Sequence, residues 1–166
     1  MAKVKTISDR LAKRKCAEWL GQNGFEKIRL AKNESCDLLA TKGSKSYFIE
    51  IKYSSKEKGI FFGTVMLTEL FQAINNRNNY LFLVCRGNGE NIKNWFFKLV
   101  KVEDFIKCCT LTTPIFLYHL YPDRNGNLSI PKFRENTILA SEELIREMWK
   151  DFNRWKSGSH LSNLEK

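Results

Sequence analysis

The amino-acid sequence predicts an α/β domain in which a central mixed sheet is flanked by helices. Short apolar runs typical of strands alternate with segments whose apolar residues recur at helical spacing. The run 80–85, YLFLVC, is apolar at every position, as expected for a central strand covered on both faces. A predicted helix separates it from the run 47–53, so these two strands can be parallel neighbours.

The first part of the chain predicts a helix followed by three antiparallel strands. Residues 7–20 place apolar side chains at helical spacing, and the glycines of GQNGF end that pattern. KGSKS has the composition of a hairpin turn between the second and third strands. The runs suited to strands are 26–31, 36–41 and 47–53.

The second part predicts three further helices and, besides the run 80–85, two further strands. Over residues 64–75, apolar side chains recur at i, i+3, i+4 and i+7, which indicates an amphipathic helix ended by NNRNN. We expect the following strands to complete the sheet. The elements expected after residue 86 are a strand over 94–100, a short helix over 102–109, a strand over 115–121 and a last helix capped by Ser141.

The length of 166 residues suits a single domain with one sizeable core. We expect it to span residues 1–156, with a core over about 7–86 and a C-terminal elaboration over 87–156, before a flexible tail over 157–166. No apolar run approaches the roughly 18 residues that span a bilayer, so no membrane partner is expected. The five cysteines form no metal or disulfide pattern, which fits a cytoplasmic location.

The charge balance favours a polyanionic partner. Lys and Arg total 28 against 18 Asp and Glu, a formal net charge of +10 at pH 7, and nucleic acid is the leading class of partner. The alternative is that the lysines only keep the surface solvated. We expect contacts to nucleic acid from Arg14 and Lys15 in a basic N-terminal cluster, and from Lys56 and Lys58 in the loop SSKEKGIFFG.

Two charges interrupt the strand-like run 47–53. Glu50 and Lys52 share one face of that strand, because successive side chains point to opposite faces. One interpretation is a solvated ion pair, which contributes under about 1 kcal/mol. The other depends on Asp37, which begins the neighbouring strand with twelve residues between it and Glu50. A tight hairpin would bring Asp37, Glu50 and Lys52 together at one end of the sheet.

Such a cluster has a chemical use. Mg²⁺ takes carboxylate, carbonyl and water oxygens, so Asp37, Glu50 and the backbone carbonyl of Ile51 could supply half of an octahedral shell. Water and a phosphate would complete it. Lys52 would then position the attacking water or help to deprotonate it.

The stretch CDLLATKGSKSYFIEIKYSS resembles the D-x(n)-E-x-K core of the PD-(D/E)XK nuclease superfamily, and is most similar to type II restriction endonucleases. The order helix, three strands, helix, strand over residues 7–86 is similar to the αβββαβ core of that superfamily. The resemblance implies a restriction-endonuclease-like fold with Asp37, Glu50 and Lys52 as the catalytic residues. It also implies a Mg²⁺-dependent endonuclease, with Mn²⁺ able to substitute and no small-molecule cofactor.

The same resemblance implies double-stranded DNA as the substrate and a homodimer, because cutting two strands needs two sites. The alternatives are a structure-selective junction or repair nuclease, a homing nuclease, a nuclease acting on RNA, or a non-catalytic nucleic-acid-binding module. The last of these would usually have lost one of Asp37, Glu50 or Lys52. We assign no role to His119 or His160, which we interpret as a core residue and a tail residue.

Some positions depart from the family pattern. Cys36 stands where the family often has proline before the aspartate. Glu34 is a possible auxiliary metal ligand because of its spacing from Asp37. Glu18 in the first predicted helix and Gln72 in the second are interpreted as surface residues, although relatives place functional polar groups in these helices.

Overall fold

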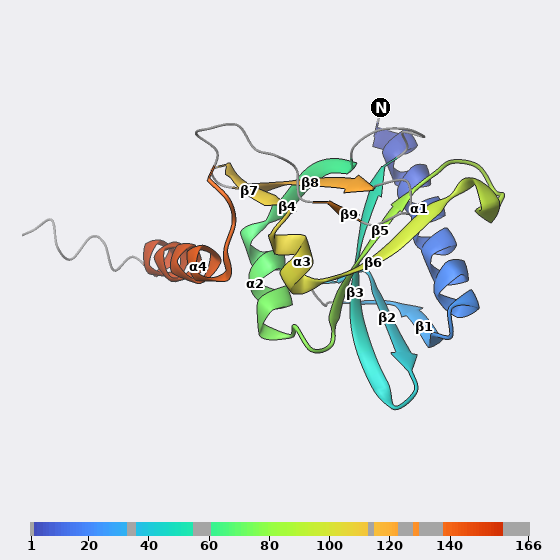
Figure 1. Ribbon diagram of the computed structural model, residues 1–166, viewed down its shortest axis with the longest axis horizontal. Helices are drawn as coiled ribbons and strands as arrows, with labels where there is room; N and C mark the ends of the chain where they lie inside the picture. Colours follow the sequence, from blue (N-terminus) through green and yellow to red (C-terminus); the bar gives the residue numbers. More distant parts are fainter. Residues whose placement is uncertain are drawn as a thin grey trace, which may run out of the picture.

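The computed structural model shows a mixed α/β fold (Figure 1). It describes residues 2–32, 36–54, 61–112, 115–122, 128–129 and 138–157. The helices are α1 (Ala2–Gln22), α2 (Leu67–Asn75), the 3₁₀ turn η1 (Ile92–Asn94), α3 (Val102–Ile106) and α4 (Glu142–Lys156). The strands are β1 (Glu26–Leu30), β2 (Leu38–Lys42), β3 (Lys45–Ser54), β4 (Phe61–Met66), β5 (Tyr80–Arg86), β6 (Phe96–Lys101), β7 (Cys109–Thr112), β8 (Ile115–Pro122) and β9 (Leu128–Ser129).

The central sheet has the strand order β1-β2-β3-β5-β6 and confirms the predicted mixed sheet. β1, β2 and β3 form the expected antiparallel meander, and β6 is antiparallel to β5. β3 and β5 are parallel, with Glu50 opposite Phe82. α1 lies across one face of this sheet, whereas α2 and α3 lie on the other side (Figure 1).

α1 is held to the sheet by an apolar stripe that the sequence pattern anticipates. Ala12, Cys16 and Leu20 recur every four residues and are completely buried. They pack in one cluster with Ile49 of β3 and with residues of β5. Gly24 follows the helix with φ +81°, a left-handed conformation that glycine adopts without strain.

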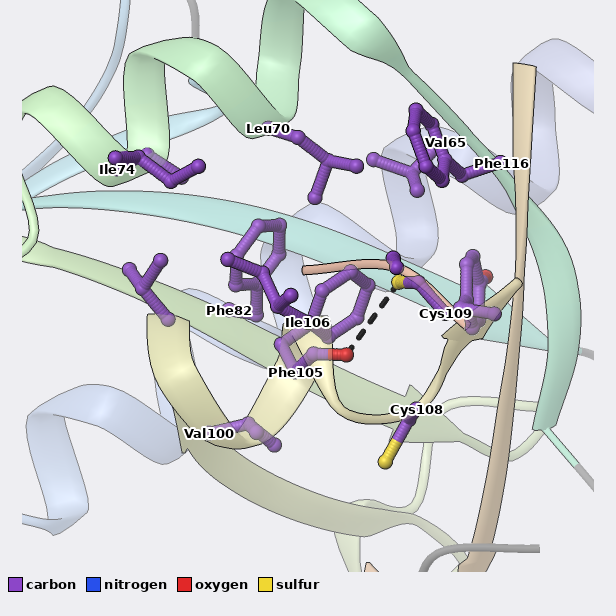
Figure 2. Close-up of a cluster of buried hydrophobic side chains, with 14 of the residues drawn as sticks. Val65, Leu70, Ile74, Phe82, Val100, Phe105, Ile106, Cys108, Cys109 and Phe116 are labelled. Atoms are coloured by element: carbon purple, nitrogen blue, oxygen red, sulfur yellow. Dashed lines mark hydrogen bonds between the residues drawn. The ribbon is translucent and has the colours of Figure 1, made fainter. Parts of the chain in front are cut away.

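The opposite face of the sheet carries a second apolar cluster, built from α2, α3 and several strands (Figure 2). Phe82 of β5 stacks on Phe105 of α3, with ring centroids 3.8 Å apart and planes at 8°. Leu70 and Ile74 of α2 point into the same cluster. The parallel neighbours β3 and β5 are therefore covered on both faces.

Phe105→Ala should lower the free energy of unfolding by about 3–5 kcal/mol, because Phe105 is fully buried and its removal leaves a cavity against Phe82. Chemical denaturation followed by circular dichroism measures the change. Phe152→Ala is the matched control. Because Phe152 of α4 is 40% exposed, its replacement should lower the free energy of unfolding much less. Equal losses in the two variants would contradict this packing.

A second sheet, of order β4-β8-β7, was not predicted. The predicted helix over 64–75 is wrong in its first turn, because residues 64–66 belong to β4 and α2 begins at Leu67. β4 pairs antiparallel with β8, so the predicted strand over 115–121 lies in this second sheet and does not complete the central one. The sheet packs on the cluster that contains Phe82.

The last part of the chain differs in detail from the prediction. The short helix expected over 102–109 ends at Ile106, and Cys109 already begins β7. The predicted cap of α4 is confirmed, because the Ser141 hydroxyl accepts a hydrogen bond from the Leu144 N–H at 3.1 Å. No helix in the described ranges is both long and apolar enough to cross a membrane.

Candidate active site

The two charges of β3 are buried. Glu50 is 9% exposed and Lys52 8% exposed, and both side chains lie on the same face of the central sheet. This burial rules out the interpretation of a solvated strand face. Burying two charges costs several kcal/mol per ion before their attraction offsets it, so stability alone is a weak reason to keep them there.

Lys52 holds two carboxylates. Its ammonium Nζ lies 3.1 Å from Oε1 of Glu50 and 2.9 Å from Oε2 of Glu69. Glu69 stands in the first turn of α2, where its Oε2 also accepts a hydrogen bond from the Met66 N–H at 3.2 Å. The start of α2 therefore fixes Glu69, and Glu69 helps to fix Lys52.

Sequence reasoning missed Glu69. Gln72 is the polar residue of this helix that the family pattern brings into question, and it is interpreted above as a surface residue. The side chain that reaches Lys52 is Glu69, one turn nearer to β4. A glutamate three residues after the end of a strand is a typical helix-start signal, because it can accept the free N–H at the helix N-terminus. That signal was hidden while the helix was expected to begin at Thr64.

Asp37 lies where the prediction expected it, beside β3 at the end of β2. The Asp37 N–H donates a hydrogen bond to the Ile49 carbonyl of β3 at 3.0 Å. Its Oδ2 accepts a hydrogen bond from the Ile51 N–H at 2.9 Å. Because N–H and C=O of one strand residue project from the same edge, the Ile51 carbonyl also faces the side on which Asp37 lies.

Lys13 of α1 is a second residue that sequence reasoning did not assign to the site. Its Nζ lies 2.6 Å from Oδ1 of Asp37 and 3.6 Å from Oδ2 of Asp9. Burial lowers the pKa of Lys13, but the bond and charge of Asp37 outweigh burial and leave it raised. No local pattern reveals this contact, because α1 and Asp37 meet only through tertiary packing.

Burial governs the charge state of the central pair. It raises the pKa of Glu50 to about 7, with Lys52 acting against the shift and the charges of Asp37 and Glu69 adding to it. Burial alone would lower the pKa of Lys52, yet the carboxylates of Glu50 and Glu69 raise it. Lys52 therefore stays positive, while Glu50 is poised between its two protonation states near neutral pH.

This shift has a consequence for stability. The folded state holds the Glu50 proton more tightly than the unfolded chain, so the Glu50 contribution to the free energy of unfolding falls as pH rises from 4.5 to about 7. Glu50→Gln removes that dependence. We expect urea unfolding of both proteins at about pH 5 and about pH 7.5 to show that the free energy of unfolding of the variant increases relative to that of the wild type as pH rises. A pH-independent difference would contradict the shift.

The residues present fit a hard divalent cation. Three carboxylates (Asp37, Glu50 and Glu69) face two ammonium groups (Lys13 and Lys52), and the charge of Asp37 already disfavours ionisation of Glu50. Within the described ranges, no three Asp, Glu, His or Cys side chains gather closely enough to hold a metal ion. A cation held by Asp37 and Glu50 would therefore need carbonyl, water and phosphate oxygens as well.

The remaining predicted site residues differ in their exposure, and some lie outside the described residues. Arg14 is exposed and pairs with Glu90. The Lys15 side chain is only 7% exposed, and its Nζ lies 2.8 Å from Glu18, so Glu18 has a structural partner. This geometry favours Arg14 over Lys15 as a phosphate contact. Glu34, Lys56, Lys58 and His160 lie outside the described residues, as does the side chain of His119.

Comparison with known proteins leaves the family open. No family model matches the chain, and no curated protein is similar to it at a significant level. Among solved structures, the chain is similar to Hjc, a Holliday junction resolvase from the archaeal hyperthermophile Archaeoglobus fulgidus. The two share 20% sequence identity over 63% of this chain and 84% of that chain, with a TM-score of 0.40. At this level of likeness, function has to be argued from the site itself.

Proposed function

We propose that this protein is a metal-dependent endonuclease of the PD-(D/E)XK type that hydrolyses phosphodiester bonds in DNA. The observation that carries the proposal is the buried Lys52 ammonium between Glu50 and Glu69, with Asp37 hydrogen-bonded to the backbone of Ile49 and Ile51 on the same strand. Two carboxylates, one carbonyl and one lysine at this point are the groups that the D-x(n)-E-x-K pattern needs.

Each residue has a separate task in the proposed reaction. Asp37, Glu50 and the Ile51 carbonyl would hold a Mg²⁺ or Mn²⁺ ion. Such an ion lowers the pKa of a coordinated water and offsets negative charge on the phosphate.

Lys52 donates hydrogen bonds to the attacking water or to the phosphate oxygens as charge develops. Glu69 keeps the Lys52 ammonium in place at 2.9 Å, and Lys13 orients the Asp37 carboxylate. Both are positioning residues rather than catalytic ones.

Two kinds of DNA substrate are compatible with the proposed site. A type II restriction-like enzyme would act on a sequence in double-stranded DNA, with the chain beyond Arg86 available for base readout in the major groove. A junction or repair nuclease would act on DNA structure. In either case, we propose a homodimer, because two strands are cut by two sites related by two-fold symmetry.

One cleavage assay tests the proposal. The protein is incubated with Mg²⁺ and, in parallel, with supercoiled plasmid, linear duplex, a four-way junction, a flapped duplex and RNA. Discrete plasmid fragments would indicate sequence specificity, and cutting of only the branched DNAs would indicate structure selectivity. Cutting of RNA alone would contradict a DNA substrate. If no nucleic acid is cut with either Mg²⁺ or Mn²⁺, the protein is a binding module and the proposal is wrong.

A further inference from the structure

A pocket of about 260 Å³ lies between α1 and β1, beside the candidate active site. It adjoins Leu38, the residue after Asp37, and Lys13 both lines the pocket and bonds to Asp37. The Lys13–Asp37 ion pair therefore links the pocket to Asp37, which in turn accepts a hydrogen bond from the Ile51 N–H of β3. Four cationic side chains line the pocket: Arg10, Lys13, Arg14 and Arg29.

The positive charge of this pocket is only partly balanced. Lys13 pairs with Asp37 and Arg14 pairs with Glu90. Arg10 and Arg29 have no ion pair in the part of the chain that the structure describes, and no acidic side chain lines the pocket. Like charges gathered at one place repel one another, so an anion bound there would relieve that repulsion.

The walls of the pocket are apolar although its rim is charged. Ile28 and Leu30 of β1 line it together with Ala17 of α1. Leu30 is 59% exposed, so its side chain is accessible to a ligand that enters the pocket. Apolar walls beneath a cationic rim suit a ligand that joins a flat, weakly polar group to phosphates. A nucleotide within a nucleic-acid strand has that chemistry.

The size and place of the pocket limit what can enter. Pockets that hold drug-sized molecules measure about 300–1,000 Å³, so this smaller one suits a single base. A base inside a duplex is stacked and paired, and it reaches a protein pocket only when it is unpaired or flipped out of the helix. The contact with Asp37 would place that base within a short distance of the bond that is cut.

We infer that this pocket receives one unpaired nucleotide of the DNA substrate, with its base against Ile28 and Leu30 and its phosphates held by Arg10 and Arg29. The inference rests on the proposed function and makes its substrate class specific. The substrate is DNA with an unpaired nucleotide near the cut, as in a bulge, gap, branch or flipped base, rather than a uniform duplex.

Binding without metal tests this inference apart from cleavage. Fluorescence anisotropy in EDTA compares a perfect duplex with the same duplex carrying one unpaired thymidine in one strand. The wild type should bind the bulged probe more tightly by about tenfold or more. The unpaired base needs little energy to leave the stack, and it gains contacts with the apolar side chains that line the pocket.

Three variants, each of which lowers the net charge by one, test whether the pocket causes the preference for the bulged probe. Arg29→Gln and Leu30→Asp should abolish the preference for the bulged probe. Lys150→Gln is the matched control, since this exposed lysine lies on α4 at the opposite end of the molecule from α1 (Figure 1). It should leave the ratio of the two affinities unchanged. Thermal unfolding checks that all three variants fold.

The possible failures are distinguishable. Equal wild-type affinity for the two probes, or an unchanged ratio in Arg29→Gln and Leu30→Asp, would overturn the pocket assignment. The proposed nuclease would survive that result if the cleavage assay shows cutting. Failure to bind either probe would also overturn the pocket assignment, whereas the nuclease proposal fails only if the cleavage assay shows no cutting.

Discussion

Lys52→Ala should lower the single-turnover rate of DNA cleavage by about two to four orders of magnitude, while DNA affinity changes little. The Lys52 ammonium is held 3.1 Å from Glu50 and 2.9 Å from Glu69, in a place where a water or phosphate can take up its remaining hydrogen-bond capacity. An interaction used mainly in the transition state affects the rate rather than the binding. The rate is measured with saturating Mg²⁺ and enzyme in excess over DNA.

The control for this variant separates catalysis from stability. Lys52→Ala leaves the buried Glu50 and the half-buried Glu69 without their cation, so the urea midpoint must be measured alongside the rate. Lys52→Met keeps most of the side-chain volume and should show the same rate loss. Lys101→Ala removes an exposed lysine of β6 and should leave the rate within a few-fold. A folded Lys52→Met protein with a near-normal rate would show that Lys52 only balances Glu50.

Asp37→Asn should abolish metal binding and cleavage without preventing DNA binding. The asparagine keeps the shape of Asp37 and can still accept the Ile51 hydrogen bond, but it loses the negative charge that pairs with Lys13 and that a metal ion would need. Mn²⁺ binding followed by electron paramagnetic resonance should therefore be lost. Binding to DNA in Ca²⁺, which usually supports binding without cutting, should be retained.

Asp9→Asn is a matched control for Asp37→Asn, because Asp9 lies on α1 and also pairs with Lys13 but is not one of the proposed metal ligands. It should keep both Mn²⁺ binding and cleavage. Full activity in Asp37→Asn, or equal losses in the two variants, would remove Asp37 from the metal site.

The central sheet could be predicted because its signals are local. The alternation of side chains along a strand placed Glu50 and Lys52 on one face. The turn KGSKS fixed the hairpin that brings Asp37 beside β3. The apolar run 80–85 and the helix before it were enough to predict the parallel pairing of β3 and β5. Each of these inferences depends on neighbours in sequence or on one short connection.

The second sheet could not be found in the same way. β4 and β8 are distant in sequence, and a strand pairing of that kind leaves no local pattern. The predicted helix includes residues 64–66 because the helical spacing of apolar residues from Leu67 onward continues into them. The β-branched Thr64 and Val65, however, suit a strand better than a helix start. The aromatic run that precedes them was read as part of a loop.

Parts of the candidate site also depend on tertiary contacts, which the sequence does not reveal. Alternation predicts that Glu50 and Lys52 share a face, but it cannot tell whether that face is covered. The structure shows that it is, by α2 among others, and α2 also supplies Glu69. Lys13 was visible only as one member of a basic cluster, because its contact with Asp37 depends on how α1 lies across the sheet.

In the proposed function, Asp37, Glu50 and Lys52 form a metal-dependent centre for cutting DNA. The most direct test treats supercoiled plasmid and branched DNA with wild-type protein and with Glu50→Gln purified in parallel, each with Mg²⁺ and with EDTA. The account predicts cleavage only by the wild type with Mg²⁺. Cleavage by Glu50→Gln at the wild-type rate, or by the wild type in EDTA, would contradict it.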